Sequence, residues 1–180
     1  MKYPNASGGL KLMFTGEILT IVGAVLTIIL IGPIISLIGS IVALVGLYRA
    51  RQDDEGYGTA FTLSTVNIVL GLVGMFFREG FGASLISIIS SIIALAIMYY
   101  VCTTTSNLLH SVGEETIAAR GQTVWNINIV CTIVSVVLSI LAYVPLLNVL
   151  AAFGAVVVVI VELVGYILYL MFLYGSYNAL

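Results

Sequence analysis

Apolar residues occupy six long runs of this chain, and glycine, proline or charged residues separate the runs. A transmembrane helix needs about 20 predominantly apolar residues to cross the hydrocarbon core of a bilayer. The pattern therefore predicts an all-α polytopic membrane protein with a single transmembrane domain over residues 1–180. The predicted spans are residues 12–31, 34–48, 59–77, 83–101, 123–144 and 147–174.

The connections between these runs alternate between short and long. The short ones contain glycine or proline, which stop helices through backbone freedom or a missing N–H; they are Gly32-Pro33, residues 78–82, and Pro145 with its neighbours. The long ones, residues 49–58 and 102–122, hold most of the charge. The chain is therefore expected to form three tight helical hairpins, with short turns on one side of the membrane and polar loops on the other.

An alternative with five spans joins residues 17–48 into one helix kinked at Pro33. That arrangement splits the basic residues evenly across the membrane, whereas six spans leave only Arg78 opposite the others. Cytoplasmic loops carry an excess of Lys and Arg, so we expect six spans in the cell membrane with both termini in the cytoplasm. The basic residues on the expected cytoplasmic side are Lys2, Lys11, Arg49, Arg51 and Arg120.

Composition excludes several classes of protein. The chain is 61% hydrophobic and 8% charged, whereas soluble domains carry about 25% charged residues. The formal net charge of -2 and the lack of a polybasic cluster give no reason to expect a nucleic-acid partner. Cys102 and Cys131 have no CxxC spacing and are expected to be small buried hydrophobes. With no nucleotide, metal or catalytic motif, we predict no cofactor, no metal and no enzymatic activity.

Acidic residues precede the third and fifth predicted helices, where they favour the positive helix N-termini. They are Asp53, Asp54 and Glu55 before one helix and Glu114 and Glu115 before the other. The sequence from Ser111 to Glu114 matches a capping box, and the lone His110 falls in the same predicted loop. Capping is the simpler interpretation of the acids, and contact with a cytoplasmic protein is the alternative.

Glu162 is the most unusual residue because it lies near the middle of the last span. A carboxylate at that depth costs at least about 2.5 kcal/mol on insertion scales, so an intramembrane acid is a functional hypothesis by default. Tyr166 and Tyr169 follow at i+4 and i+7 on the same face. A neutral Glu162 in a helix–helix hydrogen bond is the competing interpretation. Glu17, near the inner end of the first span, is expected to reach the interface.

Two asparagines complete the candidate ligand or proton site. An ungapped offset of 61 residues pairs Asn67-Ile68-Val69 with Asn128-Ile129-Val130 and suggests a parallel repeat. Small and hydroxyl residues also form stripes along the second to fifth spans, and we interpret most of them as helix-packing surfaces. The candidate site residues are Glu162, Tyr166, Tyr169, Asn67 and Asn128.

Two functions follow from these features. The first is a small-solute or ion transporter, or the membrane subunit of one, which predicts a polar cavity around Glu162. The second is a structural or assembly subunit, bound to other membrane subunits or to a cytoplasmic protein, which predicts Glu162 sealed in a helix contact. In size and helix count alone, the chain resembles the substrate-binding subunits of energy-coupling-factor vitamin transporters, and its short outer turns leave no obvious substrate lid.

Overall fold

The computed structural model describes residues 2–29, 31–74, 81–141 and 147–180, and these residues form α-helices without strands. Six helices are long and apolar enough to cross a membrane, which confirms the predicted fold class. A short 3-10 turn, Leu26–Ile29, follows the first helix. The helices are α1 (Pro4–Val25), α2 (Gly32–Ala50), α3 (Glu55–Gly74), α4 (Phe81–Ser111), α5 (Glu115–Leu141) and α6 (Asn148–Ala179).

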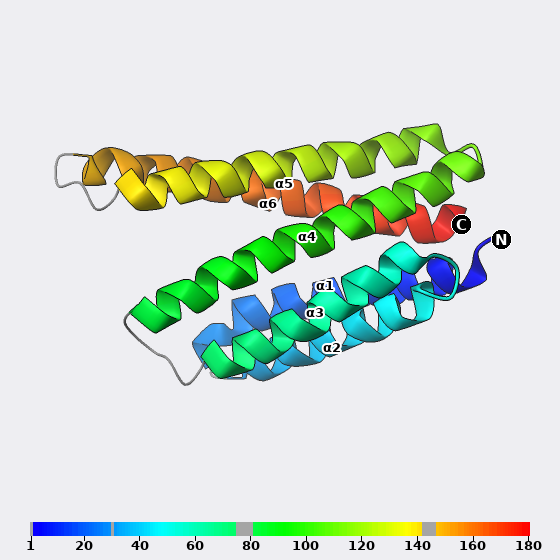
Figure 1. The fold of residues 1–180 in the computed structure, drawn as a ribbon, viewed down its shortest axis with the longest axis horizontal. Helices are drawn as coiled ribbons and strands as arrows, with labels where there is room; N and C mark the ends of the chain where they lie inside the picture. The colour runs from blue at the N-terminus through cyan, green and yellow to red at the C-terminus, as the bar shows by residue number, and fades with distance from the viewer. Residues whose placement is uncertain (1, 30, 75–80, 142–146) are drawn as a thin grey trace.

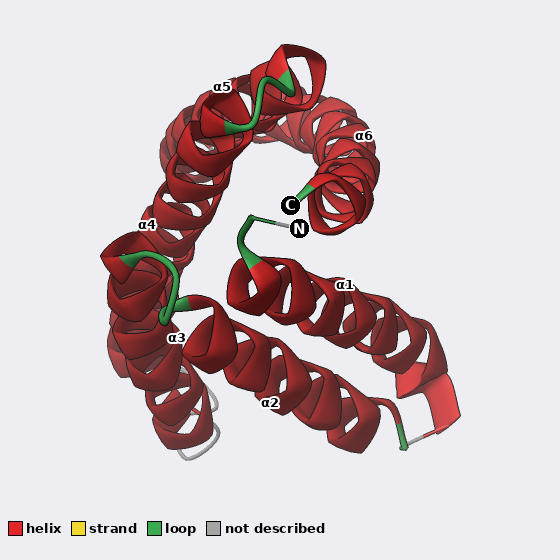
Figure 2. Cartoon of the chain, turned by 90° about the vertical axis from the view of Figure 1, so that its right-hand side faces the viewer, coloured by secondary structure: helices red, strands yellow, loops and turns green. Residues whose placement is uncertain are grey.

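The six helices form a ring in which each packs against its neighbours in the chain and α1 packs against α6. Figure 1 shows both termini at one end of the bundle, and Figure 2 views the bundle from that end, with the termini between α1 and α6. The helix pairs α1–α2, α3–α4 and α5–α6 pack together as predicted for three hairpins. Of the predicted short turns, residues 78–80 and Pro145 lie outside the described residues. The five-span alternative is wrong, because α2 turns back and packs along α1 instead of continuing it.

A glycine seam holds α1 against α2. Each helix carries three glycines at intervals of seven residues, and they meet in antiparallel order as Gly9 with Gly46, Gly16 with Gly39, and Gly23 with Gly32. A Cβ atom added to Gly9 would lie 2.5 Å from the carbonyl oxygen of Gly46, and one added to Gly46 would lie 2.5 Å from that of Gly9. Small residues allow such backbone contact between membrane helices, so α1 and α2 form the tightest pair in the ring.

The long polar loops predicted from the sequence are mostly helix. Helix α4 continues to Ser111 and α5 starts at Glu115, so the expected loop over residues 102–122 is reduced to three residues. At about 1.5 Å per residue, the 32 residues of α6 are about 48 Å long. A hydrocarbon core is about 30 Å thick, so the longest helices project beyond it.

The capping box predicted at Ser111 is wrong. Ser111 ends α4, and its hydroxyl donates to the carbonyl oxygen of Leu108 at 2.7 Å. Gly113 has a φ of 83°, the left-handed conformation that ends many helices. The N–H of Glu114 then donates to the carbonyl oxygen of Leu109 at 3.0 Å. The glycine inside the motif therefore stops α4, and a capping box cannot form across it.

The buried core lies at the end of the bundle that carries the termini. All six helices contribute to it, with Leu10, Leu47, Tyr57, Leu109, Val124 and Phe172 among the buried side chains. Away from this end, large apolar side chains face outward, for example Ile34, Val69 and Val159, which are 61%, 53% and 62% exposed. Such an apolar exterior suits lipid rather than water, and the chain is a multi-pass membrane protein.

Polar contacts stabilise the same end. The hydroxyls of Tyr57 and Thr105, both fully buried, lie 2.7 Å apart and join α3 to α4. The Ser7 hydroxyl donates to the carbonyl oxygen of Tyr177 at 2.6 Å and joins α1 to α6. Asp53 accepts the backbone N–H of Ala6 at 2.7 Å and the side-chain amide of Asn5 at 2.9 Å, so this carboxylate caps the N-terminus of α1. These bonds close the ring where the helices converge.

Candidate functional site

Glu17 and Tyr166 form a polar contact in the interior of the bundle. Glu17 lies more than three turns inside α1, and the Tyr166 hydroxyl on α6 donates to its carboxylate. The expectation that Glu17 reaches the interface is wrong. The prediction counted the first span from Leu12, but α1 begins at Pro4, and the additional turns place Glu17 near the middle of the bundle.

The Glu17 carboxylate faces a central cavity of about 250 Å³ that is bounded by α1, α2, α3, α4 and α6. Apolar side chains, among them Leu44, Ile97 and Met98, line most of its wall. The polar residues that line it are Glu17, Ser40, Ser64, Asn67, Tyr166 and Tyr169. Three of the five residues proposed from the sequence, Asn67, Tyr166 and Tyr169, are therefore brought together here.

Asn67 carries an unsatisfied acceptor at this cavity. Its side-chain carbonyl oxygen is buried and has no hydrogen-bond partner among the described residues. Leaving such an atom unpaired costs about 1–3 kcal/mol, and native proteins keep few of these atoms. A cavity lined both by a residue with an unpaired acceptor and by a carboxylate is suited to a ligand that donates hydrogen bonds or carries positive charge.

The central cavity abuts the core on one side and shares lining residues with two more open cavities on the others. Met13, Leu47 and Tyr169 belong both to its wall and to the buried core. A second cavity, of about 400 Å³ between α2 and α3, shares Ser40 and Asn67 with it. A third, of about 490 Å³ between α1 and α6, shares Tyr166. Both side cavities lie along the interfaces between the α1–α2 hairpin and its neighbouring helices.

Glu162 lies outside this group of cavities. Its side chain is exposed on α6, one turn before Tyr166, and the Ser135 hydroxyl on α5 donates to it at 3.3 Å. The polar cavity expected around Glu162 lies at Glu17 instead. The Ser135 bond joins α5 to α6, as the competing interpretation of a helix–helix hydrogen bond expects. The cavity expected around Glu162 is therefore not found there, because α6 is apolar on all sides and its sequence does not show which face turns inward. A ligand or proton site at Glu162, or its contact with another subunit, stays a prediction.

Asn128 also lies apart from the central cavity. It is partly buried on α5, and its side-chain amide donates to the carbonyl oxygen of Val124 at 3.2 Å. Its counterpart in the suggested repeat, Asn67, faces the cavity, so the two asparagines occupy different environments. Hydroxyls of the predicted stripes mostly bond within their own helices, for example Ser40 to Ser36 and Thr132 to Asn128, which agrees with a packing role.

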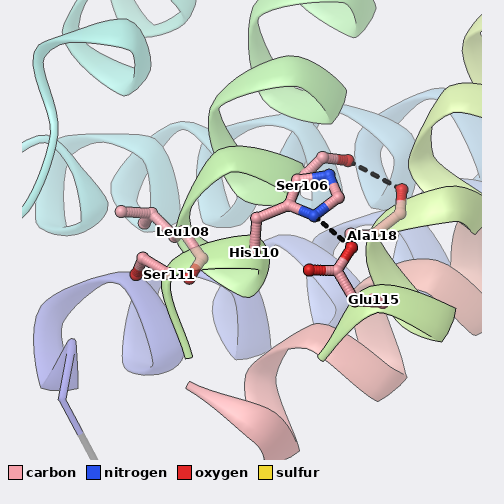
Figure 3. Close-up of polar contacts among 6 residues, drawn as sticks. All are labelled: Ser106, Leu108, His110, Ser111, Glu115 and Ala118. Carbon is pink, nitrogen blue, oxygen red and sulfur yellow. Dashed lines mark hydrogen bonds and ion pairs between the residues drawn. The ribbon is translucent and has the colours of Figure 1, made fainter. Parts of the chain in front are cut away.

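Further polar contacts lie at the turn between α4 and α5 (Figure 3). His110 lies in the last turn of α4, not in a loop, and its Nδ1 is 2.5 Å from a carboxylate oxygen of Glu115. The Ser106 hydroxyl donates to the carbonyl oxygen of Ala118 at 3.0 Å. These contacts connect two helix ends, and the exposed His110–Glu115 pair contributes little to stability.

Comparison of the chain with protein-family models, curated proteins and solved structures gave no match. Within the described residues, no group of three or more His, Cys, Asp or Glu side chains could hold a metal ion. The central cavity is therefore the candidate site on its own geometry: one carboxylate, one unsatisfied amide oxygen, hydroxyls and apolar walls, enclosed by membrane-spanning helices.

Proposed function

We propose that this chain is a small-solute or ion transporter, or the membrane subunit of one, and that the central cavity is its solute site. The observation that carries this proposal is the pairing of Glu17 with the unsatisfied Asn67 oxygen at one cavity. Polar and ionisable groups at such depth are expensive and mark solute or ion pathways. The protein binds and moves a solute without chemistry on it.

The orientation proposed is that of a cell-membrane protein with both termini in the cytoplasm. The start of α1, the end of α2 and the start of α5 lie at the end that carries the termini (Figure 1). These segments hold or adjoin Lys2, Lys11, Arg49, Arg51 and Arg120, and a one-sided excess of basic residues favours the cytoplasm. The buried core adjoins the central cavity toward that end, whereas the α2–α3 cavity extends toward the other. With this orientation, the buried core lies between the proposed solute site and the cytoplasm.

Transport is tested in proteoliposomes that contain the wild-type chain, Glu17→Gln or Glu162→Gln. A panel of inorganic cations, small amines and neutral solutes is applied, and uptake is followed with labelled solutes. We expect saturable uptake of at least one solute, strongly reduced in Glu17→Gln and unchanged in Glu162→Gln. Uptake of every solute equal to that of empty liposomes, with protein that elutes as a single folded species, contradicts the proposal.

A structural or assembly subunit is the second candidate function, and the exposed Glu162 is the observation that favours it. A carboxylate on the outer surface of a membrane-spanning helix is costly in lipid, and a contact with another membrane subunit removes that exposure. The test is blue native electrophoresis of the chain from its own membranes. A larger complex that is lost in Glu162→Leu and retained in Glu17→Gln supports assembly over transport.

A further inference from the structure

The residues that line the central cavity indicate which class of solute it binds. This inference rests on the proposed function. Two residues of the cavity wall carry acceptors with unused capacity: the Glu17 carboxylate, which receives one hydrogen bond from Tyr166, and the buried Asn67 side-chain oxygen, which receives none among the described residues. None of the described residues that line the cavity is Lys, Arg or His. A ligand that complements this wall supplies positive charge and N–H or O–H donors.

The rest of the wall favours an organic ligand over a bare metal ion. Hard cations such as Ca²⁺ take six to eight oxygen ligands, whereas most of this wall is apolar carbon and methionine sulfur. Met13 and Met98 supply soft, adaptable surface. The rings of Tyr166 and Tyr169, with centroids 6.4 Å apart and tilted by 55°, line the same cavity, and aromatic faces attract organic cations.

The size of the cavity sets an upper limit on the ligand. Sites for drug-sized molecules have volumes of about 300–1,000 Å³, and the central cavity measures about 250 Å³. A molecule of fewer atoms than a typical drug therefore fits. The charged end of such a ligand belongs at Glu17, and its apolar part belongs against Leu47 and Ile97, which lie on the apolar wall.

We propose that the central cavity binds a small protonated amine, whose ammonium group donates to the Glu17 carboxylate and to the Asn67 side-chain oxygen. The apolar body of the amine contacts the methionine and leucine side chains and the tyrosine rings. The N–H donors satisfy the one buried oxygen that the folded chain leaves without a partner among the described residues. The ammonium charge offsets a carboxylate that has no cationic partner in the same wall.

The test measures equilibrium binding to the full chain in lipid nanodiscs, with empty nanodiscs as background. The probes are phenethylamine, its neutral analogue 2-phenylethanol, and the trimethylated phenethylammonium ion, which keeps the charge but has no N–H. We expect saturable binding of phenethylamine, weaker binding of the trimethylated ion and no binding of the alcohol. Glu17→Gln is expected to weaken phenethylamine binding by about 10- to 150-fold, the range of a hydrogen bond to a charged group.

Matched variants separate the site from general effects on the fold. Asn67→Leu is expected to weaken phenethylamine binding, whereas Asn128→Leu and Glu162→Gln, on helices of the same bundle but away from the cavity, are expected to leave it unchanged. Each variant is required to keep the wild-type melting temperature within a few degrees. The proposal is overturned if Glu17→Gln and Glu162→Gln change phenethylamine binding equally. It is also overturned if the amine and the alcohol bind equally.

Two further results distinguish failure of this inference from failure of the proposed function. If ²²Na⁺ binds saturably, this binding is lost in Glu17→Gln, and phenethylamine does not bind, the amine is wrong as the ligand. The proposal of a cation transporter is then retained. Binding of neither phenethylamine nor ²²Na⁺, together with no uptake of any solute in proteoliposomes, overturns both. Phenethylamine binding without uptake keeps the ligand class and contradicts transport by this chain alone.

Discussion

Gly16 on α1 and Gly39 on α2 face each other so closely that a Cβ on Gly16 would lie 2.5 Å from the carbonyl oxygen of Gly39. The reverse contact, from a Cβ on Gly39 to the carbonyl oxygen of Gly16, would measure 2.6 Å. Backbone cannot move aside as a flexible side chain can, so even a methyl group forces the helices apart. The neighbouring residue, Glu17, is held at the central cavity by this seam.

Substitution of Gly16 by Ala is therefore expected to destabilise the protein by about 1–3 kcal/mol, the usual cost of overpacking. The control is Gly71→Ala on α3, where an added Cβ meets no atom within 4 Å. That change is expected to be neutral or to stabilise by up to about 1 kcal/mol, because alanine favours helix over glycine. Thermal unfolding in detergent measures both, and equal melting temperatures contradict the seam.

Removal of the Asp53 carboxylate is expected to loosen the start of α1. Asp53→Ala leaves the N–H of Ala6 without its partner, at a cost of about 0.5–2 kcal/mol. Asp53→Asn keeps an acceptor and is expected to cost less. Hydrogen exchange of the first two turns of α1 measures the effect, and the exposed Glu55→Ala, which makes no such bond among the described residues, is the control. Unchanged protection in Asp53→Ala contradicts the cap.

The Tyr57–Thr105 contact is expected to couple α3 and α4 energetically. Each single substitution, Tyr57→Phe or Thr105→Val, leaves one buried hydroxyl unpaired and is expected to cost about 1–3 kcal/mol. The double variant removes both groups, so its cost is expected to be smaller than the sum of the two. Chemical unfolding of the four proteins completes the cycle. If the cost of the double variant equals the sum of the two single costs, the Tyr57–Thr105 hydrogen bond is contradicted.

The sequence was sufficient to predict the helices and their hairpins, because apolar run length and helix-stopping residues are local properties. The glycine seam was also visible in principle, since glycines recur every seven residues at 9, 16 and 23 and at 32, 39 and 46. The prediction noted stripes of small residues along the second to fifth spans but not the glycines of the first span. A packing contact involves two helices, so the contact can be predicted only when the glycines of both helices are compared.

The site was harder to predict than the fold. The depth of Glu162 was evident from its neighbours, but the face it occupies depends on the rotation of α6. Glu17 was assigned to the interface because the first span was counted from Leu12, although polar Asn5 and Lys11 belong to the same helix. Tertiary contacts at the end with the termini allow these polar turns to be helical, and such contacts are not encoded in any single segment.

The orientation is expected to appear in the labelling of two exposed positions at opposite ends of the bundle. Gln52→Cys lies in the turn between α2 and α3, and Val149→Cys lies in the first turn of α6. In intact cells, a membrane-impermeant maleimide is expected to label Val149→Cys only, and permeabilised cells are expected to show both. Labelling of Gln52→Cys in intact cells contradicts the proposed orientation and indicates the reverse one.

The central claim is that the cavity at Glu17 is a polar solute site accessible to water, and adjacent cysteines on α2 test it most directly. Ser40 lines the central cavity, whereas Ile41, the next residue, is 48% exposed on the apolar exterior. Each is replaced by cysteine after Cys102→Ala and Cys131→Ala, and labelling by a charged methanethiosulfonate is timed in nanodiscs. The account predicts that Ser40→Cys reacts about tenfold faster than Ile41→Cys and is protected by phenethylamine. A Ser40→Cys that reacts no faster than Ile41→Cys contradicts it.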